Sequence, residues 1–274
     1  MHIPTALLSI LLHGATQASP IQPRQQPTPS PPSPFPIHFS CNITLRHQLS
    51  SALEETVQLA QQAKSHLLLH GLESPLVQKY FGNYSTAAPI GWYDRIISAE
   101  RGDMLFRCDD PDQNCATQDG WAGHWRGTNA TQETVICPLS FQPGKRRHLD
   151  AVCGWGHTVT ESPLNEFWAV DLLHRILHVP RISEDVVGHF ADGYEGVLEL
   201  AVTEPEKAGK DSEALQLFAL EVWSVEVSVP GVGCLGGKAE VTQTVSTVPT
   251  PTPTPVADAA EACHTHADGV MHCE

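Results

Sequence analysis

Apolar side chains recur three or four residues apart in several stretches of the chain, which is the spacing of one face of an α-helix. The longest stretch runs from Leu49 to Leu69, with Ser50 or Ser51 as its candidate cap. Later helices are expected from Ser162-Pro163 to the residue before Pro180, from Ser183 to Asp192 with Gly193 as the stop, and from Asp211 to Trp223.

Two shorter apolar runs lie in a region rich in Gly, Trp and Cys. Residues 104–106 (Met-Leu-Phe) and 135–137 (Val-Ile-Cys) predict strands. We therefore expect an α+β fold that is mainly α, with a minor β portion and loops pinned by disulfides.

The two ends of the chain lack such periodicity. Residues 1–18 hold a short apolar run followed by small residues, as in a secretory signal peptide. Pro-rich residues 19–36 predict a disordered leader, and residues 37–237 the folded domain. Residues 238–262 predict a Thr/Pro-rich linker before a Cys/His-rich tail at residues 263–274. The protein is expected to be secreted.

The charge balance narrows the class of partner. The 274 residues include 16 Lys and Arg against 31 Asp and Glu, a formal net charge of -15. This acidic balance argues against nucleic acid and against anionic membrane surfaces as partners. No later segment reaches the roughly 20 apolar residues of a membrane-spanning helix. Cations and basic partners are favoured instead.

Eight cysteines in an exported chain indicate disulfides. Six of them lie in the expected domain and their pairing stays open, namely Cys41, Cys108, Cys115, Cys137, Cys153 and Cys234. Asn42, Asn83 and Asn129 each begin an Asn-X-Ser/Thr tripeptide and are candidate glycosylation sites.

His174 and His178 lie four residues apart on the predicted helix before Pro180. Residues at this spacing lie one above the other, so both imidazoles can approach one metal ion from the same helix face. The pattern matches the zincin motif H-E-x-x-H, except that Arg175 stands where the catalytic Glu is expected. Arginine stays protonated and cannot act as a general base, so the sequence predicts metal binding without peptide hydrolysis.

A zinc site needs a third protein ligand. His189 and Asp192 are the two candidates, three residues apart on the predicted helix that follows, and the sequence does not choose between them. The alternative is that both are ordinary polar residues at a helix end. Asp171, one turn before His174, is a candidate to orient a ligand ring.

Residues 263–273 of the tail hold a second concentration of side chains that can bind a metal ion. Its candidate ligands are Cys263, His264, His266, His272 and Cys273. Thiolate and imidazole are ligands that Zn²⁺ prefers, so the tail predicts a second zinc site. The alternative is a disulfide between Cys263 and Cys273.

Together, the H-R-x-x-H helix, the segment His-Phe-Ala-Asp-Gly-Tyr at 189–194, the Cys/Trp-rich middle and the terminal cassette resemble the fungal pH-regulated antigen and zincophore family, which includes a major mould allergen. The resemblance implies a zincin-like domain related to deuterolysin-type metalloproteases, secretion, and zinc capture for return to a cell-surface transporter. It also implies association with the cell wall and binding of host complement regulators, plasminogen and fibrinogen.

The leading hypothesis is therefore a secreted zinc-binding protein with a pseudo-protease domain and no enzymatic activity. The runner-up is an active zinc endopeptidase with a non-standard base, for which Glu195 and Glu199 are the available carboxylates. A third hypothesis is an adhesion or immune-modulating ligand in which the metal is only structural.

Overall fold

The computed structural model describes residues 35–98 and 103–237, and the backbone of residues 263–265 and 271–273. The expected signal peptide, most of the leader, the linker and most of the tail lie outside the described residues. The packed region begins slightly earlier than the expected domain boundary, because Phe35 is buried and its ring contacts Phe106 edge-on, with centroids 5.8 Å apart.

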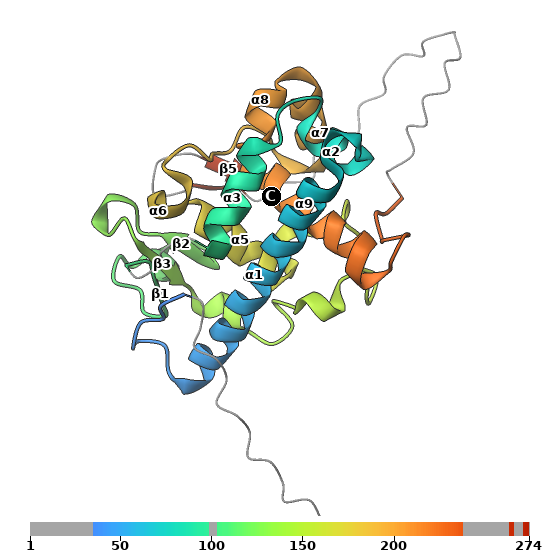
Figure 1. Ribbon diagram of the computed structural model, residues 1–274. Coiled ribbons are helices and arrows are strands. Elements are labelled where there is room, and N and C mark those ends of the chain that lie inside the picture. The colour runs from blue at the N-terminus through green and yellow to red at the C-terminus, as the bar shows by residue number, and fades with distance from the viewer. Residues whose placement is uncertain (1–34, 99–102, 238–262, 266–270, 274) are drawn as a thin grey trace, which may run out of the picture. The chain divides into compact units, whose positions relative to one another are not determined.

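The fold is mainly α, as expected, and Figure 1 shows helices surrounding the long helix α1. The α-helices are α1 (Ile43–His70), α2 (Pro75–Phe81), α3 (Ala87–Ser98), α4 (Asn114–Thr117), α5 (Trp168–Leu177), α6 (Pro180–Ser183), α7 (Gly193–Thr203), α8 (Pro205–Ala208) and α9 (Ser212–Trp223). Short 3-10 turns are η1 (Gly71–Glu73), η2 (Gly127–Asn129), η3 (Pro138–Phe141), η4 (Leu149–Ala151) and η5 (Leu164–Glu166), and a π-helical turn, η6 (Ser224–Ser228), continues α9. Among the described residues, no helix is both long and apolar enough to cross a membrane.

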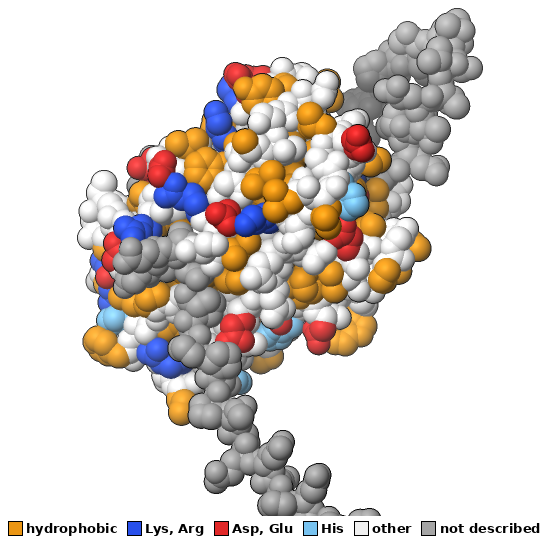
Figure 2. Space-filling view, in the orientation of Figure 1, with side chains coloured by type: hydrophobic (Ala, Val, Ile, Leu, Met, Phe, Trp, Pro, Cys, Tyr) orange, Lys and Arg blue, Asp and Glu red, His pale blue; other side chains and the backbone are white. Residues whose placement is uncertain are grey.

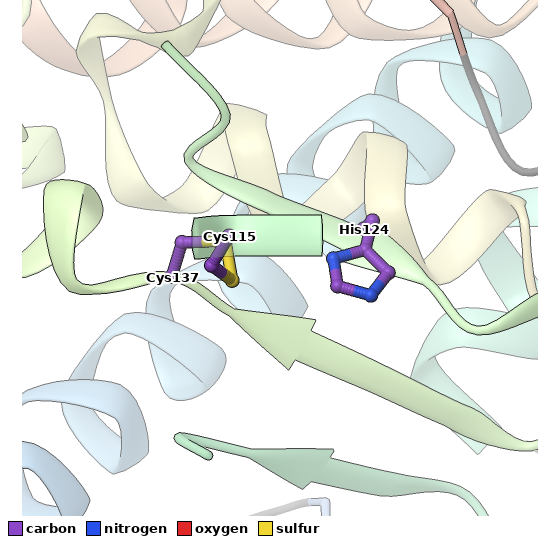
Figure 3. A group of neighbouring side chains, drawn as sticks. All are labelled: Cys115, His124 and Cys137. Atoms are coloured by element: carbon purple, nitrogen blue, oxygen red, sulfur yellow. A yellow bond between two sulfur atoms is a disulfide. The ribbon is translucent and has the colours of Figure 1, made fainter. Parts of the chain in front are cut away.

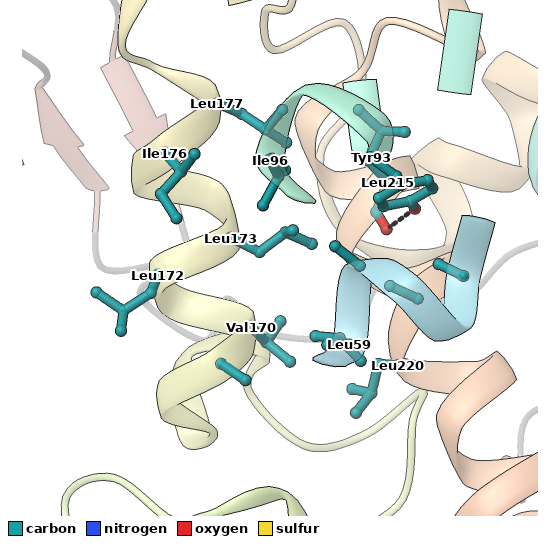
Figure 4. Packing of buried hydrophobic residues seen from close by; sticks show 14 of the residues in the cluster. Leu59, Tyr93, Ile96, Val170, Leu172, Leu173, Ile176, Leu177, Leu215 and Leu220 are labelled. Atoms are coloured by element: carbon teal, nitrogen blue, oxygen red, sulfur yellow. Dashed lines mark hydrogen bonds between the residues drawn. The ribbon is translucent and has the colours of Figure 1, made fainter. Parts of the chain in front are cut away.

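The core forms where α1 meets α3, α5 and α9. Figure 4 shows Leu59 of α1 beside apolar side chains of the other three helices. The Tyr93 hydroxyl of α3 donates to the Leu215 carbonyl of α9 over 2.6 Å, so this buried polar group has a partner. Helix α9 is buried along its whole length, and it therefore provides a rigid support for residues on either side of it.

Helix α1 begins six residues before the predicted start. Asn42 caps it, accepting from the backbone N–H groups of Thr44 and Leu45 at 3.0 Å. The first turn has no apolar periodicity, so the apolar pattern alone did not find it, and the cap is Asn42 rather than Ser50 or Ser51. Helix α9 confirms its prediction within one residue, with Asp211 as the N-cap.

The minor β portion is a three-stranded sheet of order β1-β3-β2. Strands β1 (Leu105–Arg107) and β3 (Glu133–Ile136) are parallel and lie at the two predicted places. Strand β2 (Gly123–Trp125) pairs with β3 antiparallel and was not predicted. In the tail, β4 (Cys263–Thr265) and β5 (Met271–Cys273) pair antiparallel, with Cys263 opposite Cys273 and His264 opposite His272 in the backbone register.

Three disulfides join the six domain cysteines as Cys41–Cys108, Cys115–Cys137 and Cys153–Cys234. The first ties the start of α1 to the end of β1, and the second ties α4 to the end of β3. The loops around the small sheet are thus pinned covalently, as the sequence predicted.

The helix predicted from Ser183 to Asp192 is wrong. The chain turns at Glu184 and Asp185, which both adopt left-handed backbone conformations, with φ of 52° and 56°. Gly188 then bridges to Asp211 at the start of α9, residues 189–192 are not helical, and Gly193 begins helix α7 instead of ending one. Helix α5 also begins later than predicted, because residues 164–166 form a separate turn and Phe167 bridges to Arg147.

Candidate metal centre

His174 and His178 are the pair at the end of helix α5. The apolar residues between and before them are buried against α1 and α9, which fixes the rotation of the helix and brings both rings to one face. The two Nε2 atoms lie 3.0 Å apart. Both side chains are partly exposed, so an ion held here remains accessible from solvent.

His189 joins this pair from the non-helical segment between the turn at Glu184 and helix α7. Its Nε2 lies 3.1 Å from the Nε2 of His178. Asp211 holds the segment in place, because its Oδ1 accepts from the N–H groups of Phe190 and Ala191 at 2.7 and 3.1 Å. Burial raises the pKa of the Asp211 carboxyl to about 6, against the opposing effect of these backbone hydrogen bonds.

The outer nitrogens of two rings are held by α9. Gln216 donates from Nε2 to the Val170 carbonyl over 3.0 Å, so its Oε1 is the atom that faces His174 Nδ1 at 3.1 Å. An amide oxygen only accepts, so the His174 ring donates from Nδ1 and its Nε2 keeps a lone pair. The hydroxyl of Ser212 lies 3.2 Å from His189 Nδ1 and can accept a hydrogen bond from that nitrogen. Metal-binding histidines characteristically have such partners on the other nitrogen.

Three ring nitrogens therefore converge on one point. The ligand atoms of His174, His178 and His189 all lie within 4.8 Å of one another. Lone pairs at 3.0 Å repel unless a proton or a cation lies between them. Tetrahedral zinc with Zn–N bonds of 2.0–2.1 Å spaces its ligands about 3.3 Å apart, so the rings fit this ion with small adjustments.

Asp192, the other candidate third ligand, lies outside this group. It is exposed and precedes the first residue of helix α7. The structure thus brings His189 to the pair, and Asp192 as a ligand stays a prediction. Of the predicted tail ligands, His266 lies outside the described residues, and only the backbone of Cys263, His264, His272 and Cys273 is described.

Arg175 does not face this centre as a reactive group, because it is bound to Asp171 one turn earlier. The guanidinium donates from Nε to Oδ2 over 2.9 Å and from Nη2 to Oδ1 over 3.0 Å. Arg146 adds a second, longer contact to the same carboxylate at 3.4 Å. Burial acts to raise the pKa of Asp171, but the two guanidinium groups outweigh it and hold that pKa below its ordinary value. Asp171 therefore pairs with Arg175, and its role in orienting a ligand ring stays a prediction.

A second group of possible ligands is formed by Cys115, His124 and Cys137 beside the small sheet. Figure 3 shows that the two sulfur atoms are joined in a disulfide, with the His124 ring next to it. Sulfur in a disulfide is not a thiolate and does not bind zinc. Burial lowers the pKa of His124, which favours the neutral ring.

A third group combines His66 and His70 of α1 with Glu226 of η6. Sequence analysis missed it, although His66 and His70 have the same four-residue spacing as the pair on α5. The group is hard to recognise in the sequence, because His66 lies within an apolar run typical of a helix that faces the core and because Glu226 is distant in sequence.

The three candidate glycosylation sites, Asn42, Asn83 and Asn129, are all exposed. Over the face shown in Figure 2, acidic and basic side chains are interspersed with apolar ones. The surface in that view thus has no single-sign field of the kind that binds a phosphate backbone.

Comparison with known proteins places these features in a family. The family model described as "HRXXH: Putative peptidase family" matches residues 10–237. Antigen 1 of Emericella nidulans is 48% identical over 274 residues, covering 97% of this chain and 98% of that protein. The major allergen Asp f 2 of Aspergillus fumigatus is 43% identical, covering 87% of this chain and 84% of the allergen.

The pH-regulated antigen PRA1 of Candida albicans is 46% identical over 203 residues, which are 74% of this chain and 67% of that antigen. Among solved structures, a zinc peptidase from Grifola frondosa is similar with a TM-score of 0.47 and 18% identity, covering 66% of this chain and 97% of the peptidase.

Proposed function

This chain belongs to the HRXXH family of peptidase-like proteins and fungal antigens, and from that premise we propose that it is an exported zinc-binding protein that captures zinc from its surroundings. The observation that carries the proposal is the convergence of three Nε2 atoms. The Nε2 atom of His178 lies 3.0 Å from that of His174 and 3.1 Å from that of His189. Three disulfides support export, because they persist in oxidising compartments.

The ligand set suits capture and release better than permanent retention. Three neutral imidazoles bind Zn²⁺ without neutralising its charge, and the fourth position stays open to water or to an acceptor molecule. The rings are partly exposed, so a cell-surface transporter is the proposed acceptor. The tail ligands predicted from Cys263 to Cys273 are proposed as a second zinc site that acts with the first.

We also propose that the domain is a pseudo-metalloprotease. A zincin needs a carboxylate at the position of Arg175 to take a proton from zinc-bound water. Here the side chain at that position is a cation whose donors are bound to Asp171. An endopeptidase with another base is the competing function, and it predicts peptide cleavage that stops when zinc is chelated.

The proposed host partners are complement regulators, plasminogen and fibrinogen. Their support is the family resemblance together with the antigen and allergen names of the relatives. An adhesion role of this kind is compatible with zinc capture.

The test is zinc calorimetry on the full chain and on a variant with His174→Ala and His178→Ala. We expect the variant to lose one tight site, while the tail site remains. The same preparations are then assayed with casein and with chelator. An unchanged zinc stoichiometry in the variant would contradict the capture site, and chelator-sensitive cleavage by the native chain would favour the endopeptidase.

A further inference from the structure

Helix α1 aligns three polar side chains at intervals of four residues near its C-terminal end. Gln62, His66 and His70 share one face of the helix. Gln62 Nε2 donates to Glu226 Oε2 over 2.5 Å, and His66 Nδ1 lies 2.5 Å from Glu226 Oε1. Two side chains on one face of α1 thus contact the two oxygens of the Glu226 carboxylate.

His70 completes the group from the solvent side. Its ring lies over that of His66, with centroids 4.7 Å apart, and it is exposed. One ligand atom from each of His66, His70 and Glu226 lies within 4.8 Å of the others. We infer that these three residues form a further site for a borderline divalent cation such as Zn²⁺, separate from the cluster on α5 and from the proposed tail site.

The surroundings of His66 match those of a metal ligand. Its Nε2 lies 2.7 Å from the hydroxyl of Ser74, a buried residue that also caps helix α2. When a cation replaces the proton between His66 Nδ1 and Glu226, the ring proton resides on Nε2 and is donated to Ser74. This outer hydrogen bond keeps the ring oriented.

Charge and ligand chemistry agree with this assignment. His70 is the last residue of α1, where the helix dipole places partial negative charge that favours a cation. Two imidazoles and one carboxylate are a known zinc ligand set, whereas Mg²⁺ and Ca²⁺ prefer oxygen ligands throughout. Because His70 is exposed, the fourth position is open to solvent.

This inference does not rest on the proposed function, and a site-resolved measurement keeps the two apart. The full chain is labelled with diethyl pyrocarbonate with and without zinc, and the modified histidines are identified by peptide mass spectrometry. Zinc is expected to lower the labelling of His70 severalfold, and magnesium is expected to leave it unchanged. His47, also exposed and on α1, is the internal control whose labelling stays constant.

Two substitutions complete the test. Glu226→Gln is expected to abolish zinc protection of His70, while Glu73→Gln, which removes an exposed carboxylate just after α1, keeps it. Protection should also persist in the variant with His174→Ala and His178→Ala. The proposed site would be contradicted if zinc left the labelling of His70 unchanged. It would also be contradicted if zinc still protected His70 in the Glu226→Gln variant. If Glu226→Gln does not fold, His70→Asn replaces it, and calorimetry must then show one zinc fewer per chain.

Discussion

The two sides of helix α5 use polar residues for opposite purposes. On one side, His174 and His178 point with His189 at a common centre, and the outer nitrogens of His174 and His189 face the neutral side chains of Gln216 and Ser212 on α9. On the other side, Arg175 is bound to Asp171, and this pair is almost fully buried, with side chains 12% and 5% exposed. Adjacent residues of one motif thus belong to two separate groups, the proposed metal centre and a buried ion pair.

Under the proposed function, this difference explains how a metal site is kept while the chemistry of a peptidase is lost. The residue after the first histidine points about 100° away around the helix, toward β2, where a Cβ on Gly123 would lie 3.0 Å from the Arg175 guanidinium. A group held there by a buried ion pair contributes to stability. The comparison therefore predicts that stability and zinc binding respond to separate substitutions.

The largest effect is expected on the Arg175 side. Asp171→Ala leaves the guanidinium groups of Arg175 and Arg146 without their shared carboxylate, and breaking a buried pair in this way costs about 3–5 kcal/mol. Urea unfolding of the zinc-free protein measures this loss. Asp119→Ala, at an exposed position, serves as the control and should change stability by less than about 0.5 kcal/mol. An Asp171→Ala variant as stable as the native chain would contradict the division of roles.

A somewhat smaller effect, of a different kind, is expected on the histidine side. His178→Ala removes the ring whose Nε2 contacts both others. The zinc-free protein should keep its stability within about 1 kcal/mol. The stabilisation by zinc, about 2.7 kcal/mol at a hundredfold excess over Kd, should disappear from this centre. Thermal unfolding with and without zinc measures both quantities, with His47→Ala as the control. A strongly destabilised zinc-free variant would show that the histidines also hold the fold.

The smallest effect is expected from the support behind the centre. Gln216→Met removes the acceptor at His174 Nδ1, and loss of such a partner lowers zinc affinity about 10- to 100-fold. Gln216→Glu keeps an acceptor at the same place, so its affinity should equal or exceed that of the native chain. Calorimetry measures the zinc affinity of both variants. Equal losses of affinity in the two would show that the packing of residue 216, rather than the hydrogen bond from the His174 ring, supports zinc binding.

Much of the helical framework could be predicted from the sequence. Helix α9 was found within one residue because its apolar residues recur at helical spacing throughout. The His174/His178 pair follows directly from the motif, because four-residue spacing on a helix brings rings together whatever surrounds them.

The position of His189 could not be predicted, because tertiary contacts decide it. Its segment was expected to be helical, with Gly193 as the stop, but Asp211 accepts from the backbone N–H groups of residues 190 and 191 and holds them outside a helix. That carboxylate is about 20 residues later in the chain, beyond the reach of a local pattern. His66 and Glu226 are likewise joined only by the packing of η6 beside α1.

The disulfide between Cys115 and Cys137 has a practical consequence for producing the protein. In the folded chain both sulfurs are withheld from metals, although the His124 ring lies next to them. In a recombinant host that folds the chain in a reducing cytosol, the same three residues carry two thiols and an imidazole, a strong zinc-binding combination. Material made that way is expected to carry zinc at a place that the oxidised protein does not use, so metal counts are meaningful only for chains oxidised before purification.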